Sequence, residues 1–249
     1  MKAIQIQSHG GLEVLEVTTL PEPQLIGDEV LVRIKESAVN PLDGIIRMGD
    51  FPIAKKPPLI LGEEAAGIVE RNGAGFKAGE RVIIYGGGLG VFRDGTWAEA
   101  VAVPASSLRR LPDTISFAEG AALTNVGVTA YGALRVAELK AGETLVVLGA
   151  TGGVGSAGVQ IGKAIGARVI AVVSTVGKAA RLQALGADHV IALSDGPAGR
   201  ASARANRING GRCGSRYCRR RSDRPCTIQP CIVRAAGSPR LRCGNDPDN

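Results

Sequence analysis

Residues 142–163 read Gly142-Glu-Thr-Leu-Val-Val-Leu-Gly149-Ala-Thr-Gly152-Gly153-Val-Gly155-Ser-Ala-Gly-Val-Gln160-Ile-Gly-Lys163. The apolar run 143–148 is typical of a strand buried on both faces, and residues 154–165 have the pattern of a helix. Between them the glycines follow the spacing G-x-x-G-x-x-G. A tight turn from strand to helix needs residues without Cβ atoms, and so does a pyrophosphate that approaches the backbone N–H groups at the helix start. The stretch therefore predicts a dinucleotide-binding turn.

The residues after this turn continue the same kind of fold. Gly166 ends the first helix, and a second apolar run follows at 168–173. A helical pattern at 177–185 and a short apolar run at 189–192 come next. This alternation of strands and helices predicts a parallel α/β sheet.

Residues 1–112 show a different pattern, in which short strands alternate with glycine and proline turns and no long helix is evident. The expected strands are 2–7, 12–18, 29–39, 65–71, 81–85 and 96–103. At Ser116 the pattern changes, because Glu119 completes the spacing of a helix capping box and helical periodicity continues to Val136. The expected domains are a compact β-barrel over 1–115, a partial dinucleotide-binding domain over 116–196 and an irregular tail over 197–249.

The end of the second apolar run bears on the choice of dinucleotide. An NAD site usually has an Asp or Glu at this point, which binds the ribose 2′-hydroxyl. Here Ser174, Thr175 and Lys178 follow the run, and Arg181 comes soon after. Hydroxyls and cations attract a 2′-phosphate, which favours NADPH. The alternative is that Lys178 and Arg181 are solvated helix residues.

Several further motifs accompany the glycine turn, and together they resemble one known family. They are Val39-Asn40-Pro41-Leu42-Asp43, Leu61-Gly62-Glu63-Glu64-Ala65-Ala66-Gly67-Ile68-Val69, Gly79-Glu80-Arg81-Val82 and Val128-Thr129-Ala130-Tyr131. Residues 1 to about 193 are similar to the medium-chain dehydrogenase/reductase superfamily and, within it, to the zinc-free quinone oxidoreductases related to zeta-crystallin. Thr151 stands where Ser is commoner in that group.

The resemblance implies an α/β protein with a GroES-like catalytic β-barrel, a Rossmann domain, NADPH as cofactor and a small-molecule acceptor, either a quinone or an enal. It implies a dimer for an intact member, formed through Rossmann edge strands. It places Asn40 and Thr129 near the nicotinamide, and Ser174 and Lys178 at the adenosine phosphate. The cofactor-binding residues expected in all are Asn40, Thr129, Gly149, Thr151, Gly152, Gly153, Val154, Gly155, Ser174, Thr175 and Lys178.

The residues that could hold a metal are few in the family-like part of the chain. Zinc alcohol dehydrogenases of this superfamily carry a Cys and a His at the positions of Asn40 and Glu63. Residues 1–196 contain no cysteine, and their histidines are His9 and His189. A catalytic zinc needs about three protein ligands from Cys, His and acidic side chains. We therefore expect no metal.

The substrate pocket has candidate residues, each with a second interpretation. Asn40 can hydrogen-bond an acceptor oxygen, or it can cap the turn before Pro41. Phe51 can form a wall of the pocket, or it can pack in the core. Glu63 and Glu64 can form an ion pair or a turn, and a role as general acid is the less favoured alternative.

Composition excludes some classes of function. The chain has 249 residues, of which 45% are hydrophobic and 3% aromatic. So few aromatic residues argue against a stacking surface for single-stranded nucleic acid. No apolar run is long enough for a membrane helix, and the start of the chain lacks a signal-peptide block, so a cytoplasmic protein without membrane contact is expected.

The tail differs from the rest of the chain in charge and cysteine content. Residues 197–249 contain 12 Arg, no Lys, three Asp and no Glu, so they carry +9, whereas residues 1–196 carry −2 and the whole chain +7. All five cysteines also lie in the tail. A basic nucleic-acid arm, a zinc module and an out-of-frame translation of a GC-rich gene are the possible explanations. We prefer the third, because Arg, Cys, Ser, Pro and Gly are abundant there while Lys and Glu are absent.

Two functions compete on this basis. The first is an NADPH-dependent reductase of quinones, with enals or enoyl thioesters as other acceptors for the same fold. The second is a truncated, inactive fragment of such an enzyme that binds nucleotide at most. Because the parallel sheet is expected to stop after its third strand, we expect the chain to be poorly stable and weakly active.

Overall fold

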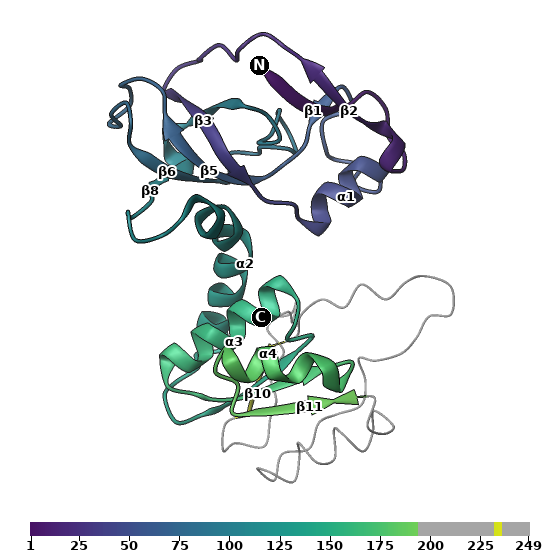
Figure 1. Cartoon of the computed structure of the whole chain (residues 1–249), viewed down its shortest axis with the longest axis vertical. Helices are drawn as coiled ribbons and strands as arrows, with labels where there is room; N and C mark the ends of the chain where they lie inside the picture. The colour runs from purple at the N-terminus through teal and green to yellow at the C-terminus, as the bar shows by residue number, and fades with distance from the viewer. Residues whose placement is uncertain (194–231, 236–249) are drawn as a thin grey trace. The chain divides into compact units, whose positions relative to one another are not determined.

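The computed structural model describes residues 1–193 and 232–235 of the chain (Figure 1). The chain divides into two compact units, Met1–Asn125 and Val126–Asn249. The predictions made for the tail therefore lie outside the described residues, apart from 232–235.

The first unit is built from antiparallel sheets, as the alternation of its sequence predicts. One sheet has the order β2-β1-β4 and the other the order β7-β3-β5-β6-β8. The strands are β1 (Lys2–Ile6), β2 (Leu15–Thr19), β3 (Glu29–Ser37), β4 (Leu59–Ile60), β5 (Glu64–Val69), β6 (Arg81–Tyr85), β7 (Ala100–Pro104) and β8 (Leu108–Arg110). The strand expected over 12–18 is partly wrong, because residues Leu12–Val14 form a 3₁₀ turn, η1, before β2 begins. A second 3₁₀ turn, η2 (Ala105–Ser107), joins β7 to β8.

Three apolar clusters form the core of this unit, the smallest of them around Ala66, Leu111 and Ala121. The largest one lies within the five-stranded sheet and includes Val32, Ile84 and Val103, all of them fully buried. The second cluster joins β1 and β4 to a short helix through Ile6, Ile46 and Leu59. Burial of such branched side chains contributes about 1.5–3 kcal/mol each, which stabilises the barrel although its turns are long.

The short helix α1 (Pro41–Met48) was not expected from the sequence pattern of residues 1–112. It begins after Asn40, has Pro41 at its first position and ends at Gly49, whose φ of 85° is left-handed. The Asp43 carboxylate accepts a hydrogen bond of 2.7 Å from the backbone N–H of Asn40. Proline at the first position and an acid at the third are helix-start signals, and they lie within the motif 39–43.

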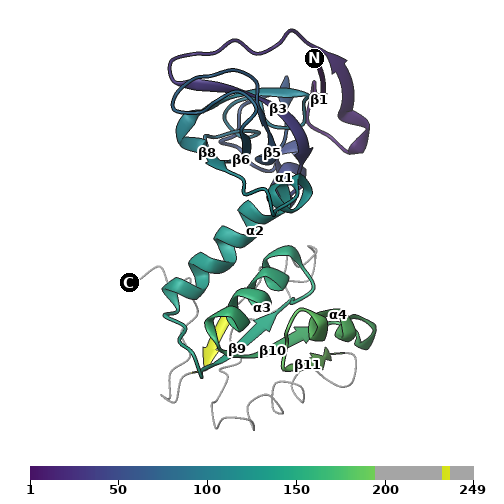
Figure 2. The same cartoon turned by 60° about the vertical axis from the view of Figure 1, so that its left-hand side comes forward.

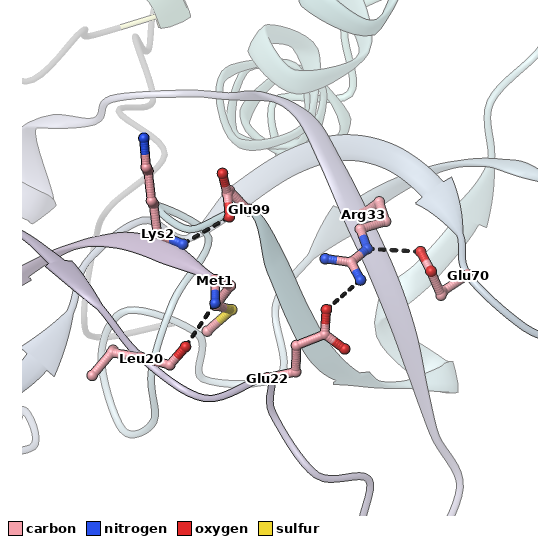
Figure 3. A network of polar contacts seen from close by, with 7 residues as sticks. All are labelled: Met1, Lys2, Leu20, Glu22, Arg33, Glu70 and Glu99. Carbon is pink, nitrogen blue, oxygen red and sulfur yellow. Dashed lines mark hydrogen bonds and ion pairs between the residues drawn. The ribbon is translucent and has the colours of Figure 1, made fainter.

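Polar contacts fix the N-terminal strand to its neighbours (Figure 3). The terminal amine of Met1 donates to the carbonyl of Leu20 over 2.7 Å. The backbone N–H of Lys2 donates to the Glu99 carboxylate over 2.7 Å. The chain start is therefore held by hydrogen bonds to residues that follow β2 and precede β7.

The Arg33 guanidinium on β3 lies between two carboxylates (Figure 3). Its Nε donates to Glu70 over 2.8 Å, and its Nη2 is paired with Glu22. Both carboxylates raise the pKa of Arg33 through hydrogen bonds, Glu70 more than Glu22. The three side chains are about a third to a half exposed, and ion pairs of that exposure contribute at most about 1 kcal/mol.

Helix α2 (Phe117–Val136) contains the residue at which the two units divide. Its start confirms the capping box expected from the sequence. The backbone N–H of Ser116 donates to the Glu119 carboxylate over 2.8 Å, and the N–H of Glu119 donates to the Ser116 hydroxyl over 3.2 Å. No helix within the described ranges is long and apolar enough to span a membrane.

The second unit contains the predicted parallel sheet. Its strands β9 (Thr144–Leu148), β10 (Arg168–Val173) and β11 (His189–Ala192) pair in parallel. Helix α3 (Gly153–Ile165) connects the first two strands, and the 3₁₀ turn η3 (Val176–Lys178) with helix α4 (Ala179–Ala184) connects the next two. Both helices lie on one face of the sheet (Figure 2). Their apolar sides meet the strands in one core around Val147, Val169 and Leu182.

A fourth strand, β12 (Ile232–Ala235), pairs with the other edge of β9 and runs antiparallel to it. The expectation of an irregular tail is therefore wrong for these four residues. In sheet order the strands are β11-β10-β9-β12.

Candidate functional site

The glycine turn connects β9 to α3 as the sequence predicts. Gly149 has a φ of 62°, a left-handed value that favours glycine. The N–H of Gly152 closes the turn on the carbonyl of Gly149 over 3.0 Å. Gly152 is then the residue before the helix, with a φ of −74° and no side chain to cap the helix. The first N–H groups of a helix have no partner within it, so this end of α3 offers donors and a positive dipole to an anion.

The glycines of this turn serve two different purposes. A Cβ atom on Gly155 would lie 2.5 Å from the carbonyl oxygen of Gly149 and 2.8 Å from the Cα of Ala150, so Gly155 is required by the close approach of helix and turn. Gly152 and Gly153 are exposed. A Cβ on Gly152 would meet its nearest neighbour at an ordinary 3.4 Å, whereas a Cβ on Gly153 would lie 2.8 Å from the Val126 side chain. The backbone is therefore bare at the helix start, which is what close approach of a pyrophosphate requires.

The residues predicted to select the cofactor follow the adjacent strand. Leu148 at the end of β9 lies opposite Val172 near the end of β10, and the N–H of Ala150 donates to the carbonyl of Val172 over 3.2 Å. The carboxyl ends of the two parallel strands therefore meet at one edge. Ser174 and Lys178 follow β10 at this edge. Ser174, Thr175, Lys178 and Arg181 are all exposed.

In the first unit, a buried carboxylate organises a network of polar side chains. The Glu64 side chain at the start of β5 is only 1% exposed. Its Oε1 accepts a hydrogen bond of 2.9 Å from the Asn40 amide, and its Oε2 accepts one of 2.5 Å from the N–H of Asn125. The hydroxyl of Thr124 also donates to Oε2. Glu64 thus joins the residue before α1 to the middle of α2 within this unit.

Asp43 is a second buried carboxylate, and it is also satisfied by donors. Its oxygens accept backbone N–H groups from Asn40 over 2.7 Å and from Gly62 over 3.0 Å. Burial raises the pKa of Asp43, the two hydrogen bonds lower it, and the charge of Glu64 raises it. Both acids therefore hold the loops around α1 and β5 in place.

Glu63 differs from its two acidic neighbours. It lines a pocket of about 110 Å³, together with Tyr85, Gly86, Gly88, Leu89 and Val91. Its Oε1 is shielded from solvent and has no hydrogen-bond partner among the described residues. Burial, and then the charges of Asp43 and Glu64, raises the pKa of Glu63 to about 7.

The other predicted site residues lie in three different surroundings. Asn40 is buried, and its amide donates to Glu64, so it is both the residue before a helix and part of a polar network. Phe51 packs against the apolar cluster of β1, β4 and α1 and is not among the residues that line the pocket. Thr129 is exposed on α2 in the second unit. Their roles toward a cofactor or acceptor stay predictions.

Sequence reasoning missed Asp43, Thr124 and Asn125 as members of the buried network. For Asp43 a signal was present, since it lies three residues after Asn40 with Pro41 between them. Thr124 and Asn125 gave no local signal, because they reach Glu64 from 60 and 61 residues away. Within the described ranges no group of three or more His, Cys, Asp or Glu residues could hold a metal ion.

Comparison with known proteins finds relatives that share the β-barrel of the first unit and the sheet of the second. Residues 27–113 match the model of the alcohol dehydrogenase GroES-like domain. The chain is 36% identical over 200 residues to a 2-methylene-furan-3-one reductase of Solanum lycopersicum, covering 77% of this chain and 52% of the relative. It spans about half the length of the curated relatives it matches.

Solved structures extend the similarity to the fold. A quinone oxidoreductase of Escherichia coli complexed with NADPH is 33% identical, with a TM-score of 0.74 over 84% of this chain and 63% of that one. An NAD-dependent alcohol dehydrogenase is also 33% identical, with a TM-score of 0.77 over 84% of this chain and 68% of that one. The chain therefore belongs to the medium-chain dehydrogenase/reductase superfamily.

Proposed function

We propose that the chain binds NADPH at the turn 149–155 and passes hydride to a quinone or a similar conjugated carbonyl without zinc. The observation that carries this proposal is the exposed backbone at Gly152, where a Cβ would meet nothing closer than 3.4 Å, at the same sheet edge as Ser174 and Lys178. That arrangement combines anion donors for a pyrophosphate with a hydroxyl and a cation for a 2′-phosphate. The similar quinone oxidoreductase of Escherichia coli forms a complex with NADPH, which supports the same choice of cofactor.

Each part of the chain has a defined task in this proposal. NADPH supplies the hydride when it is bound. The N–H groups at the start of α3 bind the pyrophosphate, and Lys178 neutralises the adenosine phosphate. Glu64 fixes the Asn40 amide through a hydrogen bond of 2.9 Å, which holds a donor-bearing side chain in one orientation. Preorganised donors of this kind stabilise the charge that develops on an acceptor oxygen.

The absence of a zinc requirement rests on the donor set in the first unit. Where zinc alcohol dehydrogenases have Cys and His, this chain has Asn40 and Glu63. The Asn40 amide nitrogen is a hydrogen-bond donor to Glu64, not a ligand to a metal. A carbonyl that is already activated by conjugation, as in a quinone or an enone, needs less polarisation than a simple ketone does. The 2-methylene-furan-3-one reductase of Solanum lycopersicum makes enones the second acceptor class to test.

Two measurements on the full chain test this function. NADPH fluorescence is titrated with the protein, and NADPH oxidation is followed with 1,4-benzoquinone and with cyclohex-2-enone. We expect NADPH binding and faster turnover with the quinone than with the enone. Binding in the micromolar range would overturn the expectation, drawn from the sequence, of a poorly stable and weakly active chain. Binding without turnover would identify the nucleotide-binding fragment instead of a reductase, and neither binding nor turnover would refute the proposed function. Turnover abolished by chelators would refute the part of the proposal that excludes zinc.

A further inference from the structure

Within the described residues, the second unit contains one of the two halves of a dinucleotide-binding sheet. Strands β9, β10 and β11 pair in parallel, and α3 and then η3 with α4 connect them in chain order. A segment of this kind is one mononucleotide-binding half, and a complete doubly wound sheet joins two of them. The half with the glycine turn binds the pyrophosphate and the adenosine ribose, so the other half receives the second nucleotide. The segment β9 to β11 therefore corresponds to the adenosine side of a dinucleotide.

The strand beside β9 runs opposite to the strand that begins a second half. In a doubly wound sheet the strand order reverses beside the first strand, and the dinucleotide crosses the crevice there. The next strand is parallel, so its carboxyl end and the start of the following helix face that crevice. β12, yellow in Figure 2, occupies this position but is antiparallel, with Ile232 opposite Val147 and Ala235 opposite Thr144. Its carboxyl end therefore lies at the edge of the sheet away from the glycine turn.

The segment from β9 to the end of α4 is rich in positive charge. Residues 144–187 contain two lysines, two arginines and no acid. Two of these cations lie at the end of the sheet away from the glycine turn and already have partners. Lys163 pairs with the Asp188 carboxylate over 2.9 Å, and the Arg168 guanidinium contacts the His189 ring over 2.6 Å. The charge that is left for a ligand is therefore at the other end.

The remaining two cations, Lys178 and Arg181, follow β10 at the same edge of the sheet as the glycine turn. Lys178 is the residue before α4, and Arg181 is the third residue of that helix. Both are exposed, and neither pairs with an acid among the described residues. Residues three apart on a helix are neighbours, so the two cations can act on one anion. With the hydroxyls of Ser174 and Thr175 they provide charge-assisted hydrogen bonds for a phosphate.

We propose that this site recognises 2′-phospho-ADP-ribose, the adenosine half of NADPH, and that the nicotinamide half adds little to binding. The inference rests on the proposed function, because the ligand is the cofactor proposed there. The N–H groups at the start of α3 bind the pyrophosphate. Lys178 and Arg181 bind the 2′-phosphate, so Arg181 is a further specificity-determining residue. Beside β9, β12 offers the nicotinamide half neither the carboxyl end of a strand nor the start of a following helix.

Calorimetry on the full chain shows which half of the cofactor carries the affinity. The ligands are NADPH, 2′-phospho-ADP-ribose, ADP-ribose and nicotinamide mononucleotide, each titrated at neutral pH. We expect 2′-phospho-ADP-ribose to bind within about 5-fold of NADPH, and ADP-ribose to bind at least about 10-fold more weakly. We expect no binding of nicotinamide mononucleotide at concentrations that saturate the site with NADPH. A dissociation constant for NADPH more than about 5-fold below that of 2′-phospho-ADP-ribose would overturn the proposal.

A pair of variants tests the assignment of Arg181. Arg181→Gln removes one of the two cations, so it should weaken binding of 2′-phospho-ADP-ribose about 5-fold or more and change that of ADP-ribose little. The matched control is Lys140→Gln, which neutralises an exposed cation before β9 and should leave both affinities unchanged. If Arg181→Gln weakens both ligands equally, or neither, Arg181 does not bind the 2′-phosphate.

Turnover with 1,4-benzoquinone separates this inference from the proposed function. If 2′-phospho-ADP-ribose binds as tightly as NADPH and NADPH is not oxidised, the inference is supported and the reductase function fails. If NADPH binds much more tightly than its adenosine half and is oxidised, the inference fails and the reductase function stands. If neither NADPH nor 2′-phospho-ADP-ribose binds, both fail.

Discussion

Two neighbouring residues, Glu63 and Glu64, show how strongly the surroundings of a residue decide its chemistry. Glu64 is buried and accepts hydrogen bonds from Asn40, Thr124 and Asn125. Glu63, one residue earlier, faces a pocket with few donors and two like charges. The same side chain is thus a hydrogen-bonded structural group at one position and an acid with a raised pKa at the next.

The raised pKa of Glu63 predicts a pH-dependent stability. Because the pKa is about 7 in the fold and about 4.5 in the unfolded chain, the folded state binds more protons between these values. The stabilisation is therefore present below about pH 4.5 and is lost as the pH rises through about 7. We expect Glu63→Gln to gain about 1–2 kcal/mol in unfolding free energy relative to the unmodified chain between pH 4.5 and pH 8, measured by urea denaturation. If the difference in unfolding free energy between Glu63→Gln and the unmodified chain does not change with pH, the pKa of Glu63 is not raised in the fold.

Gly152 allows a test of pyrophosphate binding that does not depend on stability. Asp and Asn both cap helices well at this position, and there is room for a side chain. Only Asp adds a negative charge where the pyrophosphate is expected. Gly152→Asp should weaken NADPH binding about 10-fold or more relative to Gly152→Asn in a fluorescence titration, because like charges repel at short range. Equal affinities for the two variants would place the pyrophosphate elsewhere.

The exposed side chain of Lys178 makes a prediction about cofactor choice. If it binds the 2′-phosphate, Lys178→Glu should weaken NADPH binding about 10-fold while NADH binding changes little. The matched control is Lys140→Glu, which changes another exposed lysine in the second unit. The ratio of the two dissociation constants, measured by calorimetry, checks the expectation. An equal loss for both nucleotides would show that Lys178 does not select between them.

At the scale of elements, glycine controls how closely α3 approaches the strand before it. Gly155 faces the backbone of Gly149 and Ala150, and Gly162 faces the Leu145 side chain, so the helix packs without Cβ atoms at these points. Helix propensity alone would favour alanine at every such position by about 1 kcal/mol. Where the neighbour is backbone, the clash that a Cβ would cause destabilises the fold by more than the gain in helix propensity stabilises it.

Two alanine substitutions separate these effects. Gly155→Ala would bring a Cβ within 2.5 Å of a carbonyl oxygen, and we expect it to destabilise the chain by about 1–3 kcal/mol. Gly132→Ala lies on an exposed face of α2, where a Cβ meets nothing within 4 Å, and should stabilise by about 0.5–1 kcal/mol. Urea denaturation followed by circular dichroism measures both. Stabilisation by Gly155→Ala would show that α3 does not approach the turn as closely as described.

At the scale of the whole molecule, the chain has separate cores in its two units. The clusters around Val32 and Ile6 belong to the first unit, and the cluster around Val147 belongs to the second. Trp97 is the single tryptophan of the sequence, and its indole N–H donates to the carbonyl of Ala38 over 3.0 Å in the first unit. Separate cores favour unfolding in more than one step.

This division predicts that two probes of thermal unfolding disagree. Trp97 fluorescence reports the first unit, whereas circular dichroism reports both. NADP⁺ at 100 times its dissociation constant stabilises the unit that binds it by about 2.7 kcal/mol, so the dichroism transition should shift upward more than the fluorescence transition does. Coincident transitions with equal shifts would show that the two units unfold as one.

Local features of the fold were predictable because their causes lie within a few residues. The β9-turn-α3 segment, the capping box of Ser116 and Glu119 and the end of α3 at Gly166 are each confirmed. Helix α1 was missed because its eight residues lie among strands, although its start signals were present. The turn at Leu12–Val14 was taken for a strand because apolar alternation does not distinguish the two over so few residues.

The sequence by itself determined the parallel sheet, the glycine turn and the exit of the chain from β10. Backbone conformation in these places depends on glycine, on capping side chains and on apolar periodicity within a few residues. Only the tertiary structure decided what the acids around β5 do. Glu64 receives its partners from 24, 60 and 61 residues away, and Glu63 meets a pocket formed by a loop after another strand. Burial and hydrogen bonding set the charge of a carboxyl group, and both depend on residues that only folding brings together.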